Sequence, residues 1–195
     1  KTYQAWYGVP EELLETNRTF NPAGTEKPGT PYENETDNYQ QTHYQLFFNH
    51  RFTDKLSFQT ALFYTRGKGY YEQYKADENL SDYGFVGPDF GTGAIDTTDL
   101  IRRRWLDNDF YGQIAAITYQ DNFNELTLGG GWSKYDGLHF GTLPYLRNDL
   151  APKNFKYYDN DAVKSENNLY AKWDRKLNSK AKSFIDLQVR NVQHT

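Results

Sequence analysis

The sequence predicts an all-β protein: a transmembrane antiparallel up-and-down β-barrel, of which these 195 residues supply about seven strands. Three observations support this fold class. Apolar and polar side chains alternate with a period of two residues, which is typical of strands with two different faces. The connections between the expected strands are short at one end and long at the other. Aromatic residues make up 17% of the chain, with 17 Tyr and 13 Phe, as membrane barrels with aromatic girdles require.

The first expected hairpin joins residues 44–52 to residues 56–65 through a polar turn at 53–55. In the second strand the larger apolar side chains fall on alternate positions, so they share one face. We expect one face to carry Leu56, Phe58, Leu62 and Tyr64, and the other to carry Ser57 and Gln59. In a barrel the first set contacts lipid and the second set lines the lumen.

Two more hairpins follow the same pattern. Residues 109–120 turn at 121–124 into 125–135, and residues 167–177 turn at 178–180 into a strand from 181. The expected outward-facing residues of these hairpins are Leu126, Leu128, Trp132, Ile185, Leu187 and Val189, with a weaker preference for Tyr111, Ile117 and Tyr119. The expected lumen-facing residues are Thr127, Ser133 and Gln188.

The remaining connections, at residues 15–38, 76–98 and 136–166, are long. Long segments without secondary structure are uncommon in compact domains, whereas outer-membrane barrels combine short periplasmic turns with long extracellular loops. We therefore expect the three short turns at one end of the sheet and the long connections at the other. A soluble β-sandwich, with one face of each strand in a core, is the alternative fold.

The composition excludes several classes of function. The chain has no cysteine, so disulfide scaffolds, cysteine zinc sites and thiol nucleophiles are ruled out. The net charge is −4 with both signs mixed along the chain, which argues against a nucleic-acid partner. The mean hydropathy is −0.93, and the apolar runs are too short for a transmembrane helix. The chain also lacks Met and a visible signal peptide, so we expect it to be part of a longer gene product.

The opening of the chain carries a more specific signal. Residues Gln4-Ala5-Trp6-Tyr7-Gly8-Val9-Pro10-Glu11, followed by Thr16-Asn17-Arg18-Thr19-Phe20-Asn21-Pro22-Ala23-Gly24, resemble TonB-dependent outer-membrane receptors of the Bacteroidetes type. The likeness continues through residues 39–52, 56–71, 109–119 and 157–160.

Members of that family have an N-terminal plug, a coupling box that binds TonB and a barrel of about 22 strands. The plug, the coupling box and the aromatic residue that ends a last barrel strand are not recognisable here. The resemblance therefore implies that residues 1–195 belong to a receptor barrel domain whose plug and other strands lie outside this sequence.

The resemblance implies a location in the bacterial outer membrane and transport of a scarce nutrient, an iron complex such as a ferric siderophore or haem. The implied partners are the TonB complex, outer-membrane lipid, the small nutrient ligand and a surface lipoprotein. No covalent chemistry is done on the ligand, so the protein is not expected to be an enzyme or to need a cofactor. A soluble all-β ligand- or glycan-binding module is the alternative function, and a barrel enzyme of the envelope is a third.

Six residues are candidates for ligand binding. A triplet of arginines followed by Trp105 comes where a long connection enters a strand, and two neighbouring tyrosines precede that connection: Arg102, Arg103, Arg104, Trp105, Tyr70 and Tyr71. The arginines would attract an anionic ligand, and the aromatic rings could stack on it. The competing interpretation is that the arginines pair with nearby acidic residues, such as Asp96, Asp99 and Asp107, and that the rings only pack.

Other motifs point away from catalysis and from metal binding. The four histidines, His43, His50, His139 and His194, lack metal-ligand spacing. Residues 129–131 are three glycines, but they lie inside an alternating strand and lack the Lys of a phosphate-binding loop. The acidic segments have no complete calcium-loop spacing. We therefore predict no catalytic residue and no metal ligand.

Overall fold

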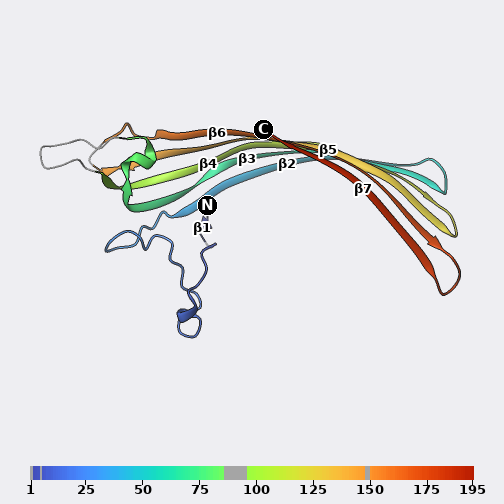
Figure 1. Cartoon of the computed structure of the whole chain (residues 1–195), viewed down its shortest axis with the longest axis horizontal. Helices are drawn as coiled ribbons and strands as arrows, with labels where there is room; N and C mark the ends of the chain where they lie inside the picture. The colour runs from blue at the N-terminus through green and yellow to red at the C-terminus, as the bar shows by residue number, and fades with distance from the viewer. Residues whose placement is uncertain (1, 5, 86–95, 148–149) are drawn as a thin grey trace, which may run out of the picture. The chain divides into compact units, whose positions relative to one another are not determined.

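The structure, a computed structural model, describes residues 2–4, 6–85, 96–147 and 150–195. It is almost entirely β-structure (Figure 1). Its elements are β1 (Thr2–Tyr3), η1 (Glu11–Leu13), β2 (Thr36–Arg51), β3 (Leu56–Asn79), η2 (Leu80–Tyr83), β4 (Thr97–Gln120), β5 (Asn124–Leu146), β6 (Phe155–Lys176) and β7 (Lys182–His194). No helix in the described ranges is long and apolar enough to cross a membrane.

The strands form one sheet in which every strand pairs with its neighbour in sequence, in the order β1-β2-β3-β4-β5-β6-β7. The terminal pairs, β1 with β2 and β6 with β7, are antiparallel. The predicted all-β, up-and-down antiparallel sheet is therefore confirmed. In the described part of the chain the sheet does not close on itself, because β1 and β7 occupy its two ends.

The chain divides into two compact units. Unit 1 contains residues 1–40, 68–107 and 138–160, and unit 2 contains residues 41–67, 108–137 and 161–195. Strands β2 to β6 contribute residues to both units. The long connections belong to unit 1 and the short turns to unit 2, so each unit is described by itself.

The strands are longer than predicted. We expected segments of about ten residues, but β2 to β6 contain 16 to 24 residues each. The predicted connection at 136–166 is mostly strand, since only residues 147–154 separate β5 from β6. The additional strand residues carry polar and charged side chains on both faces, so an alternation of apolar and polar residues does not reveal them. They still form strands, because the backbone hydrogen bonds of a sheet do not depend on apolar side chains.

The three tight turns of unit 2 share one design, in which the first side chain of each turn accepts backbone N–H bonds. Asp121 Oδ1 accepts from the amides of Phe123 (2.8 Å) and Asn124 (2.7 Å). Asn178 Oδ1 and Thr53 Oγ1 bind the amides two and three residues ahead of them in the same way. Such local bonds are the reason that Asp, Asn and Thr favour turns.

Backbone bonds also connect these turns to one another. The amide of Gln120 donates to Lys55 O (2.8 Å), and the amide of Lys176 donates to Phe123 O (2.7 Å). The turns therefore lie next to each other at one end of the strands. The prediction that all three short turns share an end is confirmed.

The predicted apolar face of unit 2 is also confirmed. Side chains from β3, β4, β5, β6 and β7 surround one shallow depression: Leu56, Ile117, Tyr119, Leu126, Leu128, Trp173, Ile185 and Leu187. Further along, another depression on the sheet is lined by Tyr44, Leu46, Leu62, Tyr64, Tyr111 and Trp132. Many of these side chains are exposed; Leu128 is 60% and Leu187 is 67% exposed.

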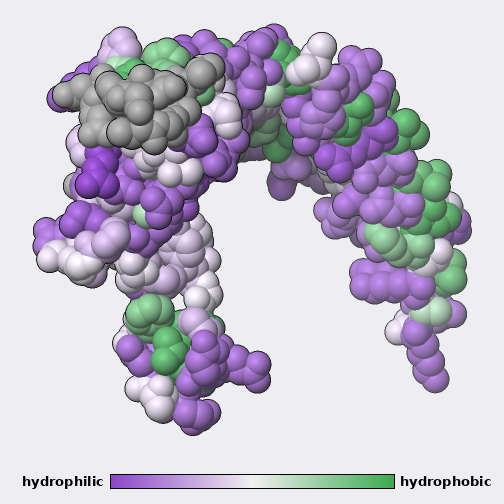
Figure 2. All heavy atoms as spheres, turned by 60° about the vertical axis from the view of Figure 1, so that its left-hand side comes forward, coloured by the Kyte–Doolittle hydropathy of each residue, from purple (hydrophilic) through white to green (hydrophobic). Residues whose placement is uncertain are grey.

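The opposite face of unit 2 is mixed, with exposed Phe47, Ile114 and Phe184 among polar pairs. Thr127 Oγ1 lies 3.2 Å from Thr118 Oγ1, and Arg190 binds both carboxylate oxygens of Glu166 at 2.8 and 2.7 Å. In the view of Figure 2, hydrophobic residues (green) form small groups between hydrophilic ones (purple), as expected where the two kinds alternate along strands.

The glycine run in β5 fits strand packing rather than phosphate binding, as predicted. A Cβ at Gly129 would lie 2.5 Å from the Tyr170 ring on the neighbouring strand, so the missing side chain makes room for that ring. A Cβ at Gly130 would lie 2.5 Å from Asn168 O. Glycine inside a strand is expected where another group approaches the backbone this closely.

Unit 1 contains a small hydrophobic core beneath its connections. The core consists of Leu80, Tyr83, Leu100, Leu143 and Leu146, and Phe85, Leu150, Ala151, Phe155 and Tyr157 pack against it. The described parts of these connections therefore have apolar packing of their own, which the sequence pattern did not predict.

The opening segment of the chain packs on the sheet of unit 1. The Gln4 side chain is fully buried and donates to Glu72 O at 2.7 Å. Asn21 Nδ2 donates to Gln4 O (2.7 Å), and Asn21 Oδ1 accepts from the Ala23 amide (2.9 Å). Several residues of the motif that carries the family resemblance therefore hold this segment in place.

Candidate functional site

The six predicted ligand-binding residues all lie in unit 1, on β3 and β4, but they do not form one patch. Successive side chains of a strand point to opposite faces, so Arg103 is separated from Arg102 and Arg104. Arg102 contacts Gln73 and Arg104 contacts Tyr71, whereas Arg103 contacts Glu72. A run of three basic residues in a strand cannot form a single cationic surface for this reason.

The Arg103 face is built around a buried carboxylate. Glu72 is 2% exposed, and its Oε2 accepts from Arg103 Nε at 2.6 Å. Tyr32 and Asn34 donate to the other carboxylate oxygen, and burial together with Glu72 raises the pKa of the Tyr32 hydroxyl. The Arg103 guanidinium also lies 4.5 Å from the centre of the Tyr70 ring. Arg103 is thus a partner for a buried acid, as the competing interpretation of the arginines proposed.

Trp105 lies in an aromatic stack on the same face. Its ring is 5.5 Å from Phe140 with an interplanar angle of 7°, and 4.4 Å from Tyr70. The indole N–H donates to Thr142 Oγ1 at 3.0 Å. With its polar group bonded and its ring between two others, Trp105 has a packing role in this structure.

The Arg102 face carries a continuous hydrogen-bonded network. Arg102 Nε and Nη2 donate to Gln73 Oε1 at 3.2 and 3.0 Å, and Nη1 donates to the Tyr83 hydroxyl at 3.1 Å. Tyr83 in turn donates to Glu78 Oε2 at 2.6 Å, which lies 3.7 Å from Arg102 Nη1. Burial, followed by the bond to Glu78, raises the pKa of the Tyr83 hydroxyl.

This network reaches the opening segment of the chain. Gln73 Nε2 donates to the Tyr7 hydroxyl (2.9 Å), and Tyr7 donates to Glu35 Oε1 (3.1 Å). Glu35 is 5% exposed, its Oε2 has no hydrogen-bond partner, and burial raises the pKa of its carboxyl group. Tyr7, Gln73 and Glu35 were not among the predicted site residues. Alternation on β3 could have found Gln73, two positions after Tyr71, but Tyr7 and Glu35 come from distant parts of the sequence.

The acidic partners of the arginines differ from those predicted. Asp99 pairs with Arg147 (3.0 Å) and Asp107 with Lys68 (2.8 Å), while Glu72 and Glu78 pair with Arg103 and Arg102. Asp96, Asp99 and Asp107 are near the arginines in sequence, but pairing between antiparallel strands brings β3 residues alongside them.

Arg104 and Tyr71 form the third part of the site. Arg104 Nη1 donates to the Tyr71 hydroxyl at 3.2 Å. The Trp6 ring packs edge-on against the Tyr71 ring, with centroids 5.8 Å apart. The opening segment therefore contacts the tyrosine-bearing strand β3 on this face.

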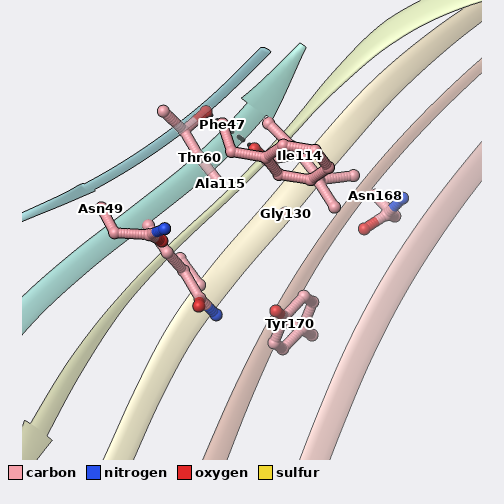
Figure 3. Close-up of a pocket in the computed structure, with 11 residues that line it drawn as sticks. Phe47, Asn49, Thr60, Ile114, Ala115, Gly130, Asn168 and Tyr170 are labelled. Atoms are coloured by element: carbon pink, nitrogen blue, oxygen red, sulfur yellow. Dashed lines mark hydrogen bonds between the residues drawn. The ribbon is translucent and has the colours of Figure 1, made fainter. Parts of the chain in front are cut away.

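A second candidate surface lies in unit 2, where a shallow depression of about 300 Å³ opens on the sheet. Figure 3 shows Phe47, Ile114 and Tyr170, from three different strands, around it, with Asn49 and Asn168 at its edges. No carboxylate, histidine or lysine lines this depression. It could receive an apolar group, but it offers no acid or base for catalysis.

The histidines do not gather into a site. His43 Nδ1 lies 2.9 Å from Thr65 Oγ1, and the His50 ring packs against Phe52. In the part of the chain that the structure describes, no group of three or more His, Cys, Asp or Glu side chains could hold a metal ion.

Comparisons with protein-family models and with curated proteins found no match for this chain.

Proposed function

We propose that this chain is part of the barrel of a TonB-dependent outer-membrane receptor that imports a scarce nutrient. The observation that carries the proposal is the two-faced sheet of unit 2. Its apolar side chains are exposed over five strands, and exposed apolar surface of that extent favours an apolar surrounding. Its other face bears ion pairs, including Arg190 with Glu166 and Lys172 with Asp186, which suits a water-filled interior.

A membrane setting also places a demand on the sheet edges. Backbone groups at an open edge cannot be satisfied in lipid, so this proposal requires further strands beside β7 and beside the free part of β2.

The type of ligand follows from the resemblance of residues 4–24 to the receptor family. We propose that the ligand is an iron complex such as a ferric siderophore or haem. The TonB complex and a surface lipoprotein are the proposed partners.

These 195 residues contain no cysteine, so single cysteines placed in them can test the two faces once any cysteine elsewhere in the full-length protein is replaced. Single cysteines replacing Leu128 or Leu187, and matched ones replacing the adjacent Thr127 or Gln188, would each carry an environment-sensitive fluorophore in the full-length protein. In vesicles of brominated lipid, we expect quenching at positions 128 and 187, and quenching by aqueous iodide at 127 and 188. If iodide reaches all four positions equally, the soluble all-β binding module is the correct function class.

The transport step needs a separate measurement in cells. Deletion of the gene should abolish energy-dependent uptake of at least one of three probes: a ferric catecholate, a ferric hydroxamate or haem. Reintroduction of the gene should restore uptake, and a protonophore should abolish it again. Unchanged uptake of all three probes would contradict the proposed iron ligand, whatever the labelling result.

A further inference from the structure

The three arginines of the triplet differ in how their charge is balanced. Arg103 pairs with Glu72 at 2.6 Å, and Arg102 lies 3.7 Å from Glu78. Arg104 has no carboxylate within 4 Å among the described residues. A half-buried guanidinium without a counter-ion is unusual, because buried charges are normally paired.

The hydrogen bonds around Arg104 are incomplete as well. Its Nη1 donates to the Tyr71 hydroxyl, but its Nε is shielded from solvent and has no partner. The Tyr157 hydroxyl is buried beside the same guanidinium, which is a hydrogen-bond donor toward it. Burial raises the pKa of Tyr157, although the Arg104 guanidinium opposes this. The phenol is therefore a neutral donor at physiological pH.

The aromatic residues of this cluster are fixed by their surroundings. Tyr157 packs against Tyr83 (4.8 Å) and Tyr158 (4.9 Å). A Cβ at Gly141 would lie 2.3 Å from the rings of Tyr157 and Tyr158, so a glycine is needed where both rings cross β5. The donors are thus held in place rather than free to turn toward other partners.

We propose that Arg104, Tyr71 and Tyr157 bind an oxyanion, carried by the ligand that the receptor imports. A guanidinium has five donors and no acceptor, and phenols can donate, so this cluster offers hydrogen bonds and positive charge without an opposing carboxylate. That combination selects a carboxylate or similar oxyanion. That the oxyanion belongs to an imported ligand rests on the proposed function. The binding of an oxyanion by these three residues does not depend on it. Arg102 and Arg103 are excluded from this role because glutamates already balance them.

The test is calorimetric titration of the full-length protein in detergent with citrate, sulfate and phosphate. Arg104→Gln should weaken binding of the preferred anion by about ten-fold or more, as loss of a charged hydrogen-bond donor predicts. Arg147→Gln is the matched control, since it removes the same charge from an exposed position in unit 1, and it should bind as the wild type does. Tyr157→Phe, which keeps the packed ring, should weaken binding about three-fold.

Equal binding by the wild-type protein and Arg104→Gln would overturn the inference, as would no binding of any of the three anions by the wild type. Unchanged protease resistance of Tyr157→Phe shows that its fold is intact. The outcome is separate from the uptake assay: anion binding without import would contradict the proposed function alone, while import with normal anion binding by Arg104→Gln would contradict this inference alone.

Discussion

Individual residues of the opening segment show how a local backbone requirement supports the site. Gly24 has φ +78°, and a Cβ there would lie 2.2 Å from Tyr32 O. Tyr32 belongs to the same cluster as Glu72 and Arg103. The conformation of one glycine is therefore linked to the packing of the segment that carries Tyr7 and Glu35.

Replacing Gly24 with Ala should loosen this segment more than the same change at Gly29. Both glycines have positive φ, which costs an alanine about 1–2 kcal/mol, but Gly29 has open space around its missing Cβ. Amide hydrogen exchange of residues 20–35 in the full-length protein measures the difference. Equal exchange rates in the two variants would show that contact with Tyr32 is unimportant.

Glu35 predicts a pH dependence for the same segment. Its pKa is raised in the folded protein, chiefly by burial, so ionisation disfavours the folded arrangement. The contribution of Glu35 to stability therefore falls as the pH rises through the unfolded pKa toward the folded one. Glu35→Gln keeps an oxygen for the Tyr7 hydroxyl and removes the charge.

We expect Glu35→Gln to protect residues 4–35 from proteolysis better than wild type at pH 7. The two proteins should behave alike near pH 4, where the wild-type carboxyl is largely protonated. Cleavage rates at the two pH values provide the check. A variant that is less protected at pH 7 would show that the charge of Glu35 stabilises the segment.

At the scale of elements, adjacent positions in one strand separate the effects of the two faces. Leu128 is 60% exposed on the apolar face of β5, and Thr127 lies on the opposite face beside Thr118. If the apolar face meets lipid, Leu128→Arg should cost about 2–4 kcal/mol near the midplane. Thr127→Arg should cost less than about 1 kcal/mol, because its side chain reaches water.

The measurement is the free energy of unfolding of the full-length protein from lipid bilayers. The two substitutions add the same side chain one residue apart, so each is the control for the other. Similar losses at both positions would contradict the membrane orientation of this strand.

At the scale of the whole molecule, the two units were predictable to different degrees. In unit 2 the period-two pattern gave the faces of Leu56, Leu128 and Leu187, and the turns at Asp121 and Asn178 followed from their side-chain chemistry. In unit 1 the alternation of apolar and polar residues predicted connections from residues 76 and 136, although the strands continue beyond these positions. The strands there carry polar groups on both faces, so the alternation is lost. The hydrophobic core around Leu80, which packs residues from separate connections, had no local signature.

The sequence by itself determined the all-β class, the alternation of the faces and the three tight turns, because each depends on residues within a few positions of one another. The tertiary structure alone decided which carboxylate balances each arginine. Glu72 reaches Arg103 from 31 residues earlier in the sequence, and Glu78 approaches Arg102 from 24 residues earlier. Such pairing depends on strand register, which local patterns do not specify. The same register leaves Arg104 among hydroxyl groups and without an acid.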